Sequence, residues 1–99
     1  MPRQFDLYRR ANGTYVVILQ HDLLEGLATW VVAPLVAANQ KGNGIRGINP
    51  AIYLGDAHLV LAIELPAAAT ERELGTYVAN VAHHRDDIIR ALDLLFTGV

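Results

Sequence analysis

The clearest structural signal in this chain lies in residues 5–19, which read FDLYRRANGTYVVIL. Apolar and polar residues alternate over Phe5–Arg9, the period-2 pattern of a half-buried β-strand. Asn12-Gly13 follows, and both residues tolerate the positive φ angles of a tight hairpin turn. The next segment, Thr14–Leu19, is rich in β-branched and aromatic residues, which favours a second strand. This part of the sequence therefore predicts a β-hairpin.

More short strands are predicted after the hairpin. Ala28–Val36 reads as a buried strand, and Pro34 within it lacks a backbone donor, which predicts an edge or a bulge there. Residues 39–47 contain three glycines and few apolar side chains, a composition typical of a mobile surface loop. Ala51–Leu54 and His58–Leu65 read as two further strands. In the strand His58–Leu65, the face that carries the leucines, as far as Leu65, is assigned to the core.

The pattern changes in the last third of the sequence. Pro66 and the run Ala67–Ala69 break the strand pattern, and Glu73–Val78 is a candidate for one more short strand. Val81–Phe96 then shows the spacing of an amphipathic helix. Its recurring apolar positions are Ile88, Leu92, Leu95 and Phe96. Short strands followed by one C-terminal α-helix predict a mainly β single domain over residues 1–99, a small barrel or curled sheet with the helix packed across it.

The ends of this helix carry their own signals. Asn80 is placed to act as the N-cap, and Gly98 is placed to end the helix. Asp86 and Arg90 stand at positions i and i+4, a spacing that predicts a weak ion pair on the helix surface.

Composition excludes several classes of protein. The formal net charge is -2 with a single lysine, so strong nonspecific binding to nucleic acid is not expected. There is no cysteine, which excludes disulfides and thiolate metal ligands and fits a cytoplasmic protein. The first residues lack a charged region followed by an apolar stretch, so no signal peptide is expected. The longest apolar run, residues 30–38, is far shorter than the ~20 residues of a membrane span.

No residue pattern identifies an enzyme, a cofactor site or a metal site. His21-Asp22 could orient a general base, but no nucleophile or phosphate cradle lies nearby in the sequence, so the pair is assigned to a surface loop. His58 is expected on the solvent side of its strand, and His83-His84 are expected to face different directions on a helix. Asp86-Asp87 suit the positive end of a helix. Arg9-Arg10 could contact phosphate, although such residues more often protect an edge strand.

Four segments together resemble the CcdB family of plasmid-addiction toxins. They are QFDLYRRANGTYVVILQHDLLEG (residues 4–26), VVAPL (31–35), AIYLGDAHLVL (51–61) and AHHRDDIIRALDLLFTGV (82–99). The resemblance runs nearly end to end and in order. It implies an SH3-like small barrel that forms a symmetric homodimer, with the two C-terminal helices side by side.

The resemblance also implies a function without catalysis. CcdB toxins insert their C-terminal tips into the central cavity of the DNA gyrase A subunit dimer and trap gyrase on cleaved DNA. A cognate CcdA-like antitoxin wraps the toxin with a disordered segment, by coupled folding and binding, and removes it. By position, the implied gyrase-binding residues are Leu23, Leu24, Asp93, Phe96, Thr97, Gly98 and Val99. The implied antitoxin-binding residues are Arg9, Arg10, Asn12, Lys41, Asn43 and Arg46, in the segments 9–14 and 40–47.

One tip residue departs from the family. Gyrase poisons place a Trp just before the terminal glycine, where it stacks on a gyrase arginine, whereas this chain has Thr97. Loss of such an anchor costs ~2–4 kcal/mol at an interface, or roughly 30- to 900-fold in affinity. Two alternatives therefore stay open. The chain could bind its antitoxin without poisoning gyrase, or it could be a ribonuclease of the MazF type, with Arg9, Arg10, His21 and Asp22 as candidate catalytic residues.

Overall fold

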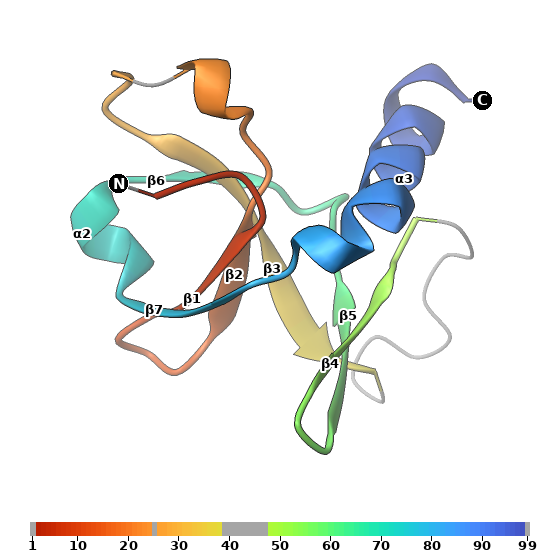
Figure 1. Cartoon of the computed structure of the whole chain (residues 1–99), viewed down its shortest axis with the longest axis horizontal. Coiled ribbons are helices and arrows are strands. Elements are labelled where there is room, and N and C mark those ends of the chain that lie inside the picture. The colour runs from red at the N-terminus through yellow and green to blue at the C-terminus, as the bar shows by residue number, and fades with distance from the viewer. Residues whose placement is uncertain (1, 25, 39–47, 99) are drawn as a thin grey trace.

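The computed structural model describes residues 2–24, 26–38 and 48–98. Short strands precede one long C-terminal helix (Figure 1). In chain order the elements are β1 (Asp6–Arg9), β2 (Tyr15–Ile18), the 3-10 turn η1 (Asp22–Leu24), β3 (Trp30–Ala37), β4 (Ala51–Leu54), β5 (Ala57–Leu61), β6 (Ala67–Ala69), α2 (Glu71–Leu74), β7 (Thr76–Asn80), the 3-10 turn η2 (Ala82–His84) and α3 (Arg85–Thr97). The mainly β fold with a C-terminal helix is confirmed.

Within the described residues the strands form one antiparallel sheet in the order β4-β5-β3-β2-β1-β7, and β6 pairs with the beginning of β3. The sheet curls into a half-barrel (Figure 1). The predicted hairpin is confirmed, because β1 pairs with β2 in the register Leu7↔Val17. Its turn is held by Asn12, whose Oδ1 accepts the backbone N–H of Thr14 at 3.1 Å, and Gly13 takes a φ of +89°. The turn chemistry therefore sets the register of the first two strands.

β3 is the central strand of the sheet, and Pro34 lies inside it without breaking it. Pro34 is opposite Val16 of β2, and its carbonyl accepts the N–H of Ala62 at 2.9 Å on the other side of the strand. On that other side, residues 30–32 pair with β6 and residues 35–37 pair with β5. Pro34 thus lies where β3 changes partners, a position at which a missing N–H leaves no strand unpaired. The predicted edge is wrong for β3 as a whole, although the changeover explains why proline is accepted.

Two hydrophobic clusters bury the two faces of the sheet. β2 contributes to both, because Val17 faces one cluster and Val16 and Ile18 face the other. The larger cluster includes Leu7, Leu61, Ile63, Ile88 and Ala91, and so packs α3 against the sheet. The smaller one consists of Val16, Ile18, Val32, Ala69 and Leu74, which places β6 and α2 on the opposite face. Burial on both faces accounts for the continuous apolar run over residues 15–19.

The structure corrects the predictions for residues 62–80. The strand expected over His58–Leu65 ends at Leu61, and Leu65 is 56% exposed instead of buried in the core. The alanine run thought to break the pattern forms β6. The strand expected near Glu73–Val78 is present as β7, but it begins only at Thr76, because Glu71–Leu74 form α2. The cause of α2 is a capping box, in which Thr70 and Glu73 bind each other's backbone N–H groups.

The C-terminal helix begins later than predicted. Asn80 ends β7, and its Oδ1 accepts the N–H of Ala82 at 2.9 Å, at the start of η2. The N-cap of α3 is His84 instead. The expected pairing of Asp86 with Arg90 is also wrong, because Arg90 lies 3.9 Å from Asp87 at i,i+3 spacing. None of the described helices is long and apolar enough to cross a membrane.

Candidate functional site

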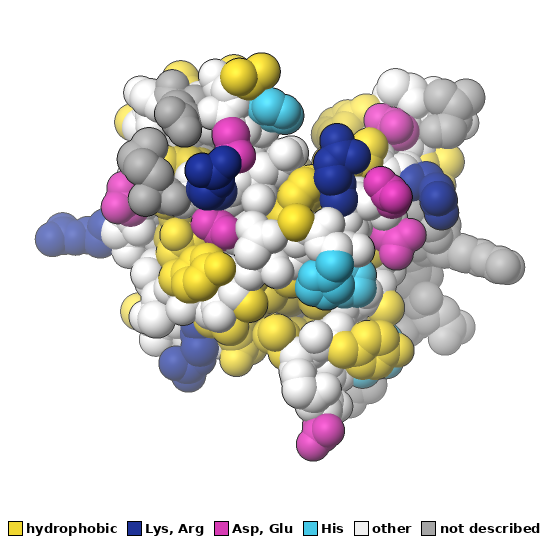
Figure 2. All heavy atoms as spheres, in the orientation of Figure 1, with side chains coloured by type: hydrophobic (Ala, Val, Ile, Leu, Met, Phe, Trp, Pro, Cys, Tyr) yellow, Lys and Arg dark blue, Asp and Glu magenta, His cyan; other side chains and the backbone are white. Residues whose placement is uncertain are grey.

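Two segments that are far apart in the sequence converge at one end of the molecule. η1 and the C-terminal end of α3 stand on either side of its upper edge in Figure 1. The space-filling view shows the surface hollowed between these two parts (Figure 2). Leu23 and Leu24 on η1 are 87% and 52% exposed, and Phe96 on α3 is 72% exposed. Large apolar side chains that are this exposed are typical of a protein-binding surface when they cluster.

An apolar cavity of 270 Å³ lies between the two segments. Leu24 and Phe96 line it together, so two residues expected at one binding surface do contribute to one site. Its other lining residues are Leu19, Gln20, Val31, Ile63, Pro66 and Leu92. None of these residues is charged, and a site of this kind suits apolar side chains better than a charged ligand or a metal ion. Sequence patterns did not predict this cavity, because the β2–η1 connection, η1, β3, the β5–β6 connection and α3 each contribute only one or two residues.

The tip of α3 is closed by its own hydrogen bonds. Gly98 is the C-cap, in the left-handed conformation with φ 76° and ψ 14°, and its N–H donates to the carbonyl of Leu94 at 3.1 Å. The Thr97 hydroxyl donates to the carbonyl of Asp93 at 2.6 Å. Asp93 is exposed, whereas Val99, also expected at this site, lies outside the described residues. The helix therefore ends in a compact cap with the ring of Phe96 beside it.

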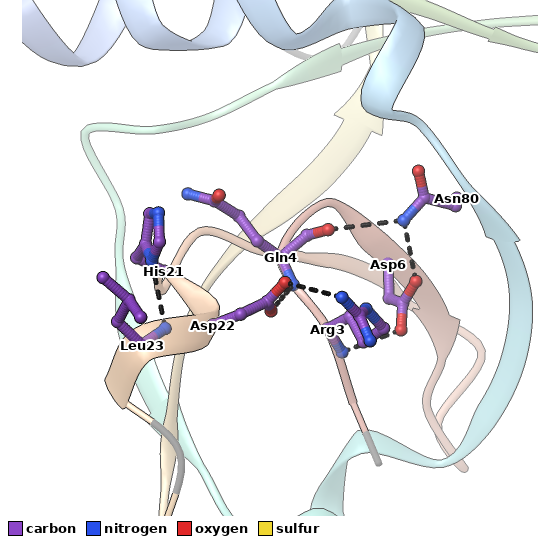
Figure 3. Close-up of polar contacts among 7 residues, drawn as sticks. All are labelled: Arg3, Gln4, Asp6, His21, Asp22, Leu23 and Asn80. Carbon is purple, nitrogen blue, oxygen red and sulfur yellow. Dashed lines mark hydrogen bonds and ion pairs between the residues drawn. The ribbon is translucent and has the colours of Figure 1, made fainter.

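The η1 turn is held by a set of polar contacts (Figure 3). Asp22 accepts the backbone N–H of Gln4 at 2.8 Å, and it lies 3.3 Å from the guanidinium of Arg3. His21 Nδ1 accepts the backbone N–H of Leu23 at 3.0 Å. These contacts fix the turn to the segment before β1 and leave both leucines exposed. Sequence reasoning placed His21 and Asp22 on a surface loop, which the structure confirms, but it did not predict their role in shaping the turn.

The residues expected at an antitoxin surface are only partly described. Arg9 is the last residue of β1 and Arg10 follows it, next to the hairpin turn made by Asn12. β1 lies between β2 and β7, so the interpretation of the two arginines as protection for an edge strand is wrong. Lys41, Asn43 and Arg46 lie outside the described residues. The described part of this surface is therefore the hairpin turn with its two arginines.

The candidate catalytic residues do not form one group. Arg9 and Arg10 lie at the end of β1 beside the hairpin turn, whereas Asp22 bonds to Gln4, which precedes the other end of that strand. Asp22 is already occupied by Arg3 and the Gln4 backbone. Within residues 2–24, 26–38 and 48–98 no group of three or more acidic, histidine or cysteine residues could hold a metal ion.

The histidines differ from expectation in one respect. His58 is exposed, as predicted, and its ring stacks on Tyr53 with centroids 4.7 Å apart. His83 and His84 were expected to point in different directions, but their ring centroids are 4.3 Å apart because both residues lie in η2 instead of a regular helix. Burial and the neighbouring His83 lower the pKa of His84, and Asp87 partly opposes this shift.

Together, the half-barrel and the exposed apolar residues of η1 and α3 define a small, mainly β domain with an apolar surface built from a turn and a helix end. The family model described as "CcdB protein" matches residues 4–98. The chain therefore belongs to the CcdB family, a family of toxins from toxin–antitoxin systems. A solved structure named "Endoribonuclease from Mycobacterial species" is similar in fold, with a TM-score of 0.74 over 93% of this chain and 88% of that one. Its sequence identity is 19%, so this likeness extends to the fold alone.

Proposed function

We propose that this chain is the toxin of a toxin–antitoxin system, and that it acts by binding the A subunit of DNA gyrase and holding the enzyme on cleaved DNA. The observation that carries the proposal is the convergence of Leu24 and Phe96 on one apolar cavity beside the capped end of α3. Membership of the CcdB family supports the choice of partner. The toxin makes and breaks no bond of its own in this mechanism.

The active form in this proposal is a cytoplasmic homodimer with its two α3 ends adjacent, as in the family. The cognate antitoxin would bind near the β1–β2 turn, where Arg9 and Arg10 suit an acidic flexible segment. An antitoxin bound only there would leave the apolar surface of η1 and α3 free to contact gyrase. Release of gyrase would require the antitoxin segment to extend as far as that surface. The expected oligomer can be checked by light scattering at micromolar concentration.

A second candidate function follows from Thr97. Its hydroxyl is bonded within the helix, and a threonine offers no aromatic face to a gyrase arginine. A chain that binds its antitoxin but no longer poisons gyrase would carry such a tip. The ribonuclease alternative is weaker, because its candidate residues lie at opposite ends of β1 and Asp22 is paired with Arg3.

The test uses purified toxin, gyrase and supercoiled DNA, with linear DNA after denaturation as the readout. Cleaved complexes should accumulate with the native chain and disappear after removal of residues 97–99 or with Phe96→Ala. Tyr53→Ala, an exposed aromatic on the β4–β5 hairpin, is the matched control and should keep the activity. Normal supercoiling in micromolar excess of toxin would contradict gyrase poisoning and favour the second candidate. RNA cleavage that survives the truncation would point to the nuclease.

The role of position 97 can be tested in the opposite direction. Thr97→Trp restores an aromatic ring at the exposed end of α3, and gyrase inhibition should then strengthen by about 30-fold or more. An unchanged inhibition would show that this tip does not contact gyrase.

A further inference from the structure

The exposed leucines of η1 lie on a turn of three residues that cannot hold its shape by packing. Both leucines face solvent, and no residue of η1 is buried. A short 3-10 turn has poor hydrogen-bond geometry of its own, so its shape depends on bonds from outside the turn. The side chains of His21 and Gln20, which precede the turn, supply two such bonds, and the Gln4 backbone N–H supplies a third to Asp22 within the turn.

His21 makes the contact closest to the leucines. Its Nδ1 accepts the N–H of Leu23 at 3.0 Å, and its carbonyl accepts the N–H of Leu24 at 3.0 Å (Figure 3). His21 therefore satisfies the backbone donors of both leucines, as the N-cap of a helix does. Gln20 completes the frame, since its amide donates to the carbonyl of Leu24 and accepts the N–H of Val31, both at 3.3 Å.

The cap works only while the imidazole is neutral. A backbone N–H is always a donor, so Nδ1 of His21 must be the unprotonated nitrogen when it accepts from Leu23. Protonation turns Nδ1 into a donor, and two donors then face each other. Histidine is the side chain that ordinarily changes charge between pH 5 and 8. Among the described residues, the charged groups beside it are Asp22 of η1 and Arg3, and Asp22 is directed toward Arg3 and the Gln4 backbone (Figure 3).

We propose that His21 is a positioning residue, whose neutral ring holds Leu23 and Leu24 in the conformation that meets the target and releases them when it is protonated. This inference rests on the proposed function, because it assumes that the leucines contact the target protein. It adds a residue that acts through the turn without touching the partner. The proposal also predicts that target binding is weaker in acid. Stronger binding in acid is excluded, because the protonated ring is a donor at Nδ1 and cannot accept the N–H of Leu23.

The experiment compares three replacements at two pH values. Binding to purified gyrase A subunit is measured at pH 8.0 and pH 5.5 for the native chain, His21→Asn, His21→Ala and His58→Asn. Asparagine can accept the same N–H without titrating, so His21→Asn should bind like the native chain at pH 8.0 and keep its affinity at pH 5.5. The affinity of the native chain for the gyrase A subunit should fall about threefold to tenfold between pH 8.0 and pH 5.5. His21→Ala should bind more weakly by that factor at both pH values.

His58→Asn is the matched control, since His58 is exposed and lies on the distant β4–β5 hairpin. The affinity of His58→Asn for gyrase should therefore fall at pH 5.5 by the same factor as that of the native chain. The proposal would be overturned if His21→Asn lost as much affinity as the native chain between pH 8.0 and pH 5.5. It would also be overturned if His21→Ala bound gyrase as tightly as the native chain at pH 8.0.

A second measurement separates this inference from the gyrase assignment. In the free protein, the NMR amide shift of Leu23 should follow the titration of the His21 ring and become constant with pH in His21→Asn. A Leu23 amide that ignores the His21 titration refutes the positioning role even if gyrase binds. A coupled titration without any gyrase binding keeps the role of His21 in the turn and refutes the proposed partner instead.

Discussion

Replacement of Gly75 by alanine should be among the most destabilising single-methyl changes in this chain. Gly75 connects α2 to β7 with φ 87° and ψ -132°, a region of backbone conformation that is nearly reserved for glycine. A Cβ added there would meet the carbonyl oxygen of Arg9, and it would lie 2.9 Å from the Cα of Arg10 and 3.0 Å from the carbonyl carbon of Arg9. All three neighbours are backbone atoms, so no side-chain rotation can relieve the clash.

The magnitude follows from these two effects. A non-glycine residue in such a conformation costs about 1–3 kcal/mol, and an overpacked methyl costs about 1–3 kcal/mol more. Gly75→Ala should therefore lower the free energy of unfolding by about 2–6 kcal/mol, a large share of the ~5–15 kcal/mol that a domain possesses. Because 1 kcal/mol shifts Tm by about 4–8 °C in a chain of this size, Tm should fall by at least about 8 °C.

Gly55→Ala is the matched control. Gly55 also has a positive φ, +56°, but an added Cβ finds no atom within 4 Å. Its cost should be limited to the ~1–2 kcal/mol of the left-handed conformation. Urea unfolding followed by circular dichroism, with all proteins at the same concentration because any dimer would add to stability, measures both changes. Equal losses for Gly75→Ala and Gly55→Ala would refute the role assigned to the Arg9–Arg10 backbone.

Three further predictions concern α3, α2 and the η2 turn. Ile88→Ala should cost about 2–5 kcal/mol in urea unfolding, because Ile88 is fully buried between α3 and the sheet. Thr70→Ala should cost about 1 kcal/mol because it removes the hydroxyl half of the capping box. The backbone N–H and the hydroxyl of Thr70 both lower the pKa of Glu73, and since alanine keeps only the first of these bonds, the difference between the two proteins should shrink as the pH falls below about 4.5. The lowered pKa of His84 means that the unfolded chain binds more protons, so stability should drop as the pH falls below about 6.5, and His84→Asn should reduce the change in urea midpoint between pH 8 and pH 5.5.

Local signals in the sequence predicted the parts of the fold that depend on neighbouring residues. The alternation in residues 5–9 and the turn at Asn12-Gly13 fix a hairpin through contacts only a few residues apart, and both are confirmed. Ala67–Ala69 forms a strand only because it pairs with Trp30–Val32, a distant partner that no local pattern indicates. α2 is a different kind of miss, since the Thr70–Glu73 capping-box spacing was present in the sequence and could have predicted a helix start.

The candidate site was only partly accessible from the sequence. The resemblance to CcdB toxins named Leu24 and Phe96, and the structure places both on one cavity. Periodicity alone assigned Phe96 to the apolar face of the helix, but Phe96 is 72% exposed and lines the cavity beside the last turn of α3. The role of His21 was invisible, since a hydrogen bond to a backbone N–H two residues on leaves no pattern in side-chain hydrophobicity.

The geometry of the tip decides which residues can contribute affinity in the proposed complex. Thr97 donates its hydroxyl to the carbonyl of Asp93, so its polar group is already engaged within the helix. Gly98 has no side chain and shapes the end of the helix through its left-handed conformation. Among the described residues of η1 and α3, the large exposed apolar side chains are therefore Leu23, Leu24 and Phe96, on two separate elements. Because a surface divided in this way binds well only when its parts keep a fixed distance, the polar frame around η1 should matter more here than in a toxin with an aromatic anchor at the helix end.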